Sequence, residues 1–171
     1  MIEFISTQFS DEFSTDAFTS GKPSLDRWLI EHAKTAQAKR IAQVFVWHNN
    51  GDAAVCAYFT LSAHEIVAED LPRRLHRGMP DKIPSILLGK LALDRSLHGR
   101  GLGGQLLYDV FQRVLSVSRD LGARYLVVDA LDDEAATFYE YYGFTRMIGD
   151  HSLRLVRKFG DLEADVDAWS D

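Results

Sequence analysis

Apolar residues recur at helical spacing downstream of residue 100. They predict an amphipathic helix from about Gly101 to Leu121, with Gly122 as the residue that ends it. The apolar face of this helix is formed by Leu102, Leu106, Val110, Val114 and Leu121. Just before it, Ser85 to Leu93 is an almost unbroken apolar run, which is typical of a central strand.

The N-terminal third contains apolar residues at helical spacing first and two predicted strands after them. Ser24 is the predicted N-cap of a helix that reaches about Arg40, because apolar residues follow it at helical spacing. Residues 43–47 and 53–62 are predicted strands, and the Asn-Asn-Gly-Asp sequence at 49–52 between them is typical of a hairpin turn.

The remaining pattern completes an α+β order. Residues 64–84 are expected to form a polar connection with a short helix around Leu71 to Leu75, and residues 160–171 an acidic, weakly helical tail. The other expected elements are strands at 2–9, 125–129, 144–148 and 152–158 and a helix at 132–142. The order predicts a mixed, largely antiparallel sheet with helices on both faces.

Composition narrows the class of protein. The 171 residues are 46% hydrophobic and 11% aromatic, which indicates a single globular, soluble domain over residues 1–171. Cys56 is the only cysteine, so no disulfide can form within the chain, and a reducing cytoplasm is the expected setting. Its place between Val55 and Ala57 favours a small core residue. The chain start lacks the apolar stretch of a signal peptide, and no apolar run is long enough to span a bilayer.

The charge is unevenly distributed. The net charge is −6 and the pI about 5.5, which argues against a nucleic-acid partner. Residues 72–124, however, contain ten Lys and Arg against four Asp and Glu, so a basic middle lies between acidic flanks.

The segment His98-Gly99-Arg100-Gly101-Leu102-Gly103-Gly104 is the strongest chemical signal. A glycine-rich loop that opens into a helix presents backbone N–H groups and the positive end of the helix dipole to a phosphate. Arg100 and Arg95 can add charged contacts to a pyrophosphate or ribose phosphate.

Two other interpretations of the loop stay open. Gly99, Gly101 and Gly104 satisfy the dinucleotide-binding pattern G-x-G-x-x-G, and Asp129 closes the next predicted strand at a suitable distance. Five residues separate the preceding strand from the first glycine, and too little chain remains for a dinucleotide domain with a catalytic partner. The loop could also be a glycine-rich turn that binds nothing.

A second motif, at residues 132–144, favours one interpretation of the glycine loop. Asp132-Asp133-Glu134-Ala135-Ala136-Thr137-Phe138-Tyr139 leads into Tyr-Gly-Phe at 142–144. With the glycine loop, this segment resembles the acetyl-CoA loop and the C-terminal tyrosine helix of the GNAT acetyltransferase superfamily. The resemblance implies the GNAT fold, acetyl-CoA as cosubstrate and no metal. It departs from the usual pattern at His98, where Gln or Arg is common, and at Asp132, where Asn is common.

The resemblance also implies a set of site residues. The backbone of the strand end would pair with pantetheine, the loop would hold the phosphates, and Tyr139 would be the catalytic acid. The expected acetyl-CoA contacts are Leu91, Ala92, Leu93, His98, Gly99, Arg100, Gly101, Leu102, Gly103, Gly104, Asp132, Ala135 and Phe138.

Tyr139 suits the role of an acid on chemical grounds. A phenol with a pKa near 10 is protonated at neutral pH and can donate a proton to the departing thiolate. No carboxylate interrupts residues 85–93, and Asp94 and Glu65 are the remaining candidate bases. Without a base, an α-amine, whose pKa is about 7.7–8.0, is a better acceptor than a lysine side chain.

The N-terminal half narrows the resemblance to the toxin branch of the superfamily. The segments Ser24–Leu29, Ala53–Ser62, Ile83-Pro84 and Leu88–Asp94 carry it. The branch acetylates the α-amine of aminoacyl-tRNA, which blocks translation; its members dimerise and are neutralised by a ribbon-helix-helix antitoxin. The cations that would then meet tRNA phosphates are Lys34, Lys39, Arg40, Arg73, Arg74 and Arg77. An acetyltransferase for a small amine or a protein N-terminus, and a non-catalytic CoA-binding or partner-binding module, are the alternatives.

Overall fold

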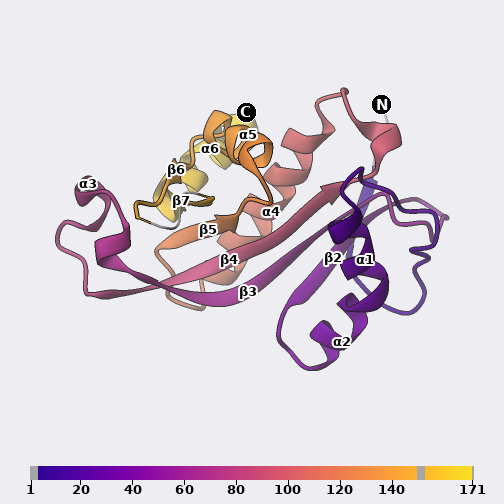
Figure 1. The fold of residues 1–171 in the computed structure, drawn as a ribbon, viewed down its shortest axis with the longest axis horizontal. Helices are drawn as coiled ribbons and strands as arrows, with labels where there is room; N and C mark the ends of the chain where they lie inside the picture. Colours follow the sequence, from indigo (N-terminus) through magenta and orange to yellow (C-terminus); the bar gives the residue numbers. More distant parts are fainter. Residues whose placement is uncertain (1–3, 150–152, 171) are drawn as a thin grey trace. The chain divides into compact units, whose positions relative to one another are not determined.

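The computed structural model describes residues 4–149 and 153–170. The chain divides into two compact units, Met1–Ser62 with Gly89–Asp109 and Ala63–Leu88 with Val110–Asp171. Three elements run through both units, namely β3 (Ala57–Val67), β4 (Lys82–Leu93) and α4 (Leu102–Ser118), all labelled in Figure 1. We call the two parts the first and the second unit.

The strands follow the order β1-β2-β3-β4-β5-β7-β6 in a mixed sheet. β4 pairs in parallel with β5, whereas β1–β2, β2–β3, β5–β7 and β6–β7 are antiparallel. The other strands are β1 (Phe4–Gln8), β2 (Gln43–Asn49), β5 (Tyr125–Asp129), β6 (Thr145–Arg146) and β7 (Arg154–Lys158). This confirms the expected α+β class. It also excludes the dinucleotide interpretation of the glycine loop, which requires a doubly wound parallel sheet.

The core of the first unit lies between its strands and two short helices, α1 (Pro23–Glu31) and α2 (Ala33–Ala38). Tyr58 is fully buried there, stacks on Trp28 with ring centroids 6.0 Å apart, and donates its hydroxyl to the Leu25 carbonyl at 2.6 Å. Burial raises the pKa of Tyr58, and Asp26 adds to this.

The N-terminal helix differs from the expectation at both ends. Ser24 is not the N-cap, because Pro23 already occupies the first turn and Lys22 is the cap residue. The helix also breaks at His32, and α2 ends at Ala38, before the expected Arg40, whose φ of 59° is incompatible with a helix. The hairpin is confirmed with Val46 opposite Tyr58, although β3 starts at Ala57 and not at Ala53.

The core of the second unit joins β5 and β7 to the connection before β4. That connection is more regular than expected, because β3 continues to Val67 and β4 already begins at Lys82. Between them lie η1 (Ala68–Asp70) and α3 (Arg73–His76), and Leu71 is fully buried. The Tyr125 hydroxyl donates to the Leu75 carbonyl and so ties this segment to β5.

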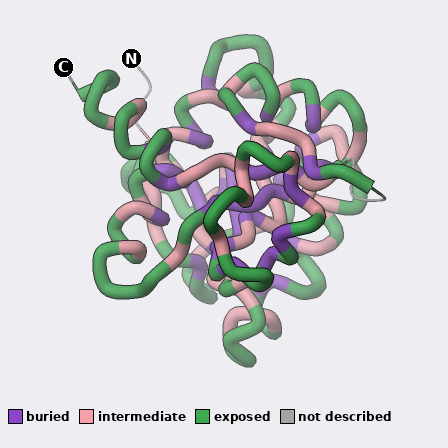
Figure 2. Tube along the Cα trace, turned by 90° about the vertical axis from the view of Figure 1, so that its left-hand side faces the viewer, coloured by how far each residue is buried: buried purple, intermediate pink, exposed green. Residues whose placement is uncertain are grey.

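Most predicted boundaries on the C-terminal side are close to the observed ones. β5 spans the predicted residues, and α5 (Asp133–Tyr141) and α6 (Phe159–Ser170) form as helices. α4 ends at Ser118, so Gly122 does not end it and Leu121, off the helical stripe, is 57% exposed. Figure 2 colours the trace by burial and shows buried stretches alternating with exposed ones along the chain. The predicted strand ends at residues 2–3 and 152 lie outside the described residues.

No helix within residues 4–149 and 153–170 is long and apolar enough to cross a membrane.

Candidate active site

The glycine loop is open where a phosphate would need space. Gly99 and Gly101 have φ values of +76° and +74°, a conformation that residues with a side chain rarely adopt. A Cβ atom added at either position would meet nothing within 4 Å. α4 begins at the next residue, Leu102, so the free N–H groups of its first turn follow the loop directly. The loop therefore forms a cradle built from backbone.

The start of the loop is anchored to the end of β4. Nε2 of His98 lies 2.8 Å from the Leu93 carbonyl oxygen, which can only accept, so His98 donates. Between them, η2 (Arg95–Leu97) is capped by Asp94, whose carboxylate accepts from the Ser96 N–H and hydroxyl. His98 thus acts as a tether in this structure, while Arg100 is exposed beside it.

Asp94 is a poor candidate for the general base. Burial alone would raise its pKa, but hydrogen bonds from Ser96 and from the Thr19 N–H outweigh burial and lower it. A carboxylate with a lowered pKa holds protons weakly near neutral pH.

β4 extends past its pairs with β5. The parallel ladder spans Ser85–Leu88 on β4 and Tyr125–Val128 on β5, and β4 continues to Leu93 beyond the last of these pairs. Leu91, Ala92 and Leu93 therefore lie on the segment past the ladder, as expected of residues that pair with a ligand amide through backbone groups.

In the second unit, α5 holds Tyr139 in an aromatic cluster. The Tyr139 side chain is 5% exposed, and its ring meets Phe138 and Phe144 edge to face at 5.3 and 5.6 Å. Burial raises the pKa of the phenol, and the negative charge of Asp129 raises it further. Tyr139 is therefore protonated over the physiological pH range and can only donate a proton there.

Asp132 has a structural role at the start of α5. Its Oδ1 atom accepts from the Ala135 N–H at 2.9 Å, which makes it the N-cap of the helix. The aspartate thus does the capping work that an asparagine would do at the same position.

Three polar residues that the sequence does not bring together meet at the end of β5. Arg154 on β7 donates from Nε and Nη2 to the two carboxylate oxygens of Asp129, at 2.7 and 3.3 Å. Its third nitrogen, Nη1, lies 3.4 Å from Nε2 of His64 on β3. We call these residues the His64–Arg154–Asp129 cluster. His64 and Arg154 are 90 positions apart, and only the folded structure brings their side chains into contact.

The six predicted tRNA-contacting cations fall into two groups. Lys34, Lys39 and Arg40 lie on or after α2 in the first unit, and Arg73, Arg74 and Arg77 lie on or after α3 in the second. All six are exposed. Lys34 pairs with the equally exposed Asp11 at 2.9 Å, and such a surface pair contributes little to stability.

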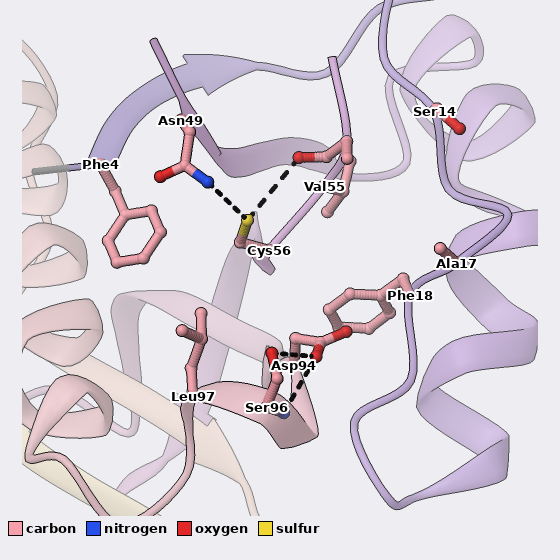
Figure 3. A pocket seen from close by; sticks show the side chains of 11 residues that line it. Phe4, Ser14, Ala17, Phe18, Asn49, Val55, Cys56, Asp94, Ser96 and Leu97 are labelled. Carbon is pink, nitrogen blue, oxygen red and sulfur yellow. Dashed lines mark hydrogen bonds between the residues drawn. The ribbon is translucent and has the colours of Figure 1, made fainter. Parts of the chain in front are cut away.

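A separate pocket of about 410 Å³ opens in the first unit, with Cys56 and Asp94 in its lining. Figure 3 shows the Cys56 thiol between the Asn49 amide and a backbone carbonyl, with Phe4 and Phe18 at either side. Burial raises the pKa of the thiol, and the charge of Asp94 adds to this. Cys56 is therefore a pocket-lining thiol of low reactivity and not the small core residue expected.

The described residues contain no group of His, Cys, Asp and Glu that could hold a metal ion. No family model matches the chain.

Similar proteins give a consistent picture. The chain is 37% identical over 137 residues to a tRNA-acetylating toxin of Mycobacterium tuberculosis, covering 80% of this chain and 81% of the relative. It is similar to a tyrosine mutant of KacT, with a TM-score of 0.88, 26% identity and coverage of 94% and 98% of the two chains.

Structures of AtaT with bound ligands are also similar to this chain. The complex with acetyl-methionyl-tRNAfMet matches with a TM-score of 0.87, 28% identity and coverage of 95% of this chain and 98% of that one. A tyrosine-to-phenylalanine mutant of AtaT, bound to acetyl-CoA and to the C-terminus of the antitoxin AtaR, matches with a TM-score of 0.82 and 27% identity over 94% and 96% of the chains. By the identity and coverage of the mycobacterial relative, this chain belongs to the family of tRNA-acetylating toxins with the GNAT fold.

Proposed function

We propose that this protein transfers the acetyl group of acetyl-CoA to the α-amino group of an aminoacyl-tRNA and thereby blocks translation. The observation that carries the proposal is 37% identity, over most of both chains, to a tRNA-acetylating toxin. The similar AtaT structures, with acetyl-CoA and with acetyl-methionyl-tRNAfMet, represent a cosubstrate and a product of that reaction.

The glycine loop would hold the pyrophosphate of acetyl-CoA through its backbone. The open cradle at Gly99 and Gly101 supports this assignment, because a bound phosphate would occupy the space where Cβ atoms are missing. Gly103 and Gly104 in the first turn of α4 add N–H groups without side chains, and Arg100 adds a positive charge. The backbone of Leu91–Leu93 would pair with the pantetheine arm. Ala135 and Phe138 on α5 would complete the contacts.

The chemistry requires one proton donor at the leaving group. The neutral amine attacks the thioester carbonyl carbon, the C–N bond forms, and the C–S bond breaks as the tetrahedral intermediate collapses. Tyr139 donates its phenolic proton to the departing sulfur, the amine releases one proton to solvent, and Tyr139 then regains a proton from solvent. The protonated state of the buried phenol supports this role.

The proposal also covers the domain organisation and the partners of the protein. We infer that residues 1–171 act as one catalytic domain, because β3, β4 and α4 each belong to both compact units. The branch that the sequence resembles also implies a cytoplasmic homodimer that a ribbon-helix-helix antitoxin neutralises. An AtaT structure with the antitoxin AtaR supports the existence of such a partner.

The direct test is acetyl transfer from labelled acetyl-CoA to charged tRNA. Uncharged tRNA and polyamines serve as parallel acceptors. Label that appears only on charged tRNA, and that is released with the amino acid on mild alkaline hydrolysis of the ester, is the expected result. Label on polyamines alone would redirect the proposal to small amines, and label on no acceptor would overturn it.

A further inference from the structure

The His64–Arg154–Asp129 cluster continues an apolar face of the sheet in the second unit. Ile66, Val127 and Val156 belong to one buried core cluster. Because side chains two residues apart on a strand point to the same face, His64, Asp129 and Arg154 lie on that face, one step further along their strands. The polar His64–Arg154–Asp129 cluster thus lies at the edge of an otherwise apolar face.

The partners of His64 determine which of its ring nitrogens carries the proton. A guanidinium group has donors only, so Nε2 of His64, 3.4 Å from Nη1 of Arg154, must be the unprotonated nitrogen. The single proton of a neutral imidazole is then on Nδ1. Arg154 cannot swing away freely, since Asp129 holds its other two nitrogens, Nε and Nη2. The cluster therefore presents one oriented N–H donor on a half-buried neutral ring.

The charges around His64 keep the ring neutral. Burial lowers its pKa and Arg154 on β7 lowers it further, which outweighs the opposite effects of Asp129 on β5 and Glu65 on β3 itself. The bidentate pair also neutralises Asp129, so the cluster offers no unpaired carboxylate to an ammonium group. Such a site suits a neutral group that accepts a hydrogen bond better than it suits a cation.

The cluster also lies at the end of β5 that precedes α5. Asp129 is the last residue of β5, and its charge is felt by the Tyr139 phenol, the proposed acid. Asp132, the N-cap of the helix that holds Tyr139, follows only three residues later, so the cluster adjoins the segment that leads into that helix.

We propose that His64 binds the acceptor substrate by donating its Nδ1 proton to the carbonyl oxygen next to the attacking amine, with Arg154 and Asp129 as positioning residues. The inference rests on the proposed function, because an aminoacyl ester carries such an oxygen one carbon from its α-amine. A lysine side chain or a polyamine has no oxygen there. His64 would thus be a specificity residue that favours aminoacyl esters over simple amines.

Two substitutions at His64 separate this role from others. An asparagine amide can place an N–H near the position of Nδ1, whereas a glutamine amide reaches the position of Nε2, towards Arg154. We expect His64→Gln to raise the KM for charged tRNA by about two- to tenfold, the effect of one lost hydrogen bond, with little change in kcat. We expect His64→Asn to retain a KM within about twofold of the wild type, since it keeps that bond.

Arg154→Lys tests the positioning role. A lysine cannot hold both carboxylate oxygens and the imidazole, so the tautomer of His64 is no longer imposed and the KM for charged tRNA should rise. Arg146→Lys is the control at another arginine, whose guanidinium pairs with Asp133 and Glu140. Acetyl-CoA affinity and thermal unfolding are measured for every variant, so that loss of fold is recognised.

The outcomes are distinct. An equal loss of kcat in both His64 variants would identify a general base and overturn the inference, as would an unchanged KM in His64→Gln. If the wild type acetylates no charged tRNA at all, the proposed function fails and the inference falls with it. If the wild type acetylates charged tRNA and only the His64 pattern is absent, the inference alone fails.

Discussion

The two parts of the chain that contain the candidate site residues, one in each unit, are built from different chemistry. Residues 91–104 work through backbone, since the loop has positive φ values, open space beside two glycines and N–H groups at a helix start. Residues 129–142 work through side chains, with a buried phenol, a capping carboxylate and a bidentate arginine–aspartate pair. The first part depends on its backbone conformation and on the absence of side chains at Gly99 and Gly101. In the second part each side chain has its own task.

This difference matches what each part would bind. A pyrophosphate needs several converging N–H donors, and any glycine-rich helix start can supply them. Proton donation and acceptor recognition need particular atoms at particular places. The departures at His98 and Asp132 fit the same division, because His98 tethers the loop and Asp132 caps a helix.

The largest expected loss of activity comes from a substitution within residues 129–142, which work through their side chains. Tyr139→Phe removes the proton donor and keeps the ring, so kcat should fall about 10²- to 10⁴-fold while acetyl-CoA affinity stays nearly constant. Steady-state kinetics and calorimetric titration with acetyl-CoA measure the two quantities. Unaltered turnover would remove Tyr139 from its role.

The backbone part is tested by a matched pair of glycine substitutions. Gly101→Ala and Gly51→Ala each add a Cβ atom at a φ near +75°, in open space, so both should cost about 1 kcal/mol of stability. Only Gly101→Ala should weaken acetyl-CoA binding, by about tenfold or more, because its Cβ enters the cradle. Equal affinity in the two variants would show that the loop is not the phosphate site.

The capping role of Asp132 predicts a smaller effect. Asp132→Ala should lower the free energy of unfolding by about 1 kcal/mol, and Asp132→Asn should lower it much less, because asparagine caps helices as well. Urea denaturation measures both. A large loss of acetyl-CoA affinity in the asparagine variant would mean that the carboxylate charge, and not the cap, is the important property.

The smallest effect appears only at alkaline pH. The pKa values of Tyr58 and Tyr139 are raised in the folded protein, so the stability they contribute is present below about pH 10 and is lost as the pH rises further. Ultraviolet titration should show that these two of the six tyrosines ionise last. Ionisation of all six in one step near pH 10 in the folded protein would contradict the burial of both phenols.

Much of the fold could be predicted because apolar periodicity is a local signal. Residues 125–129, α5 and the hairpin around 49–52 follow from neighbouring residues, and the boundaries of β5 and α5 are nearly as predicted. Ser24 was misleading for an equally local reason, since Pro23 begins the helix one residue earlier. The break at His32 and the extension of β3 to Val67 have no such signal.

The sequence by itself determined the glycine loop, the tyrosine and the family, because each depends on residues that are adjacent or a few positions apart. Only the tertiary structure decided how Asp94 is tied, how deeply Tyr139 is buried and that His64 meets Arg154. These properties depend on contacts between segments that are distant in the chain. Burial and charge then change a pKa or orient a proton in ways that no single segment of the sequence encodes.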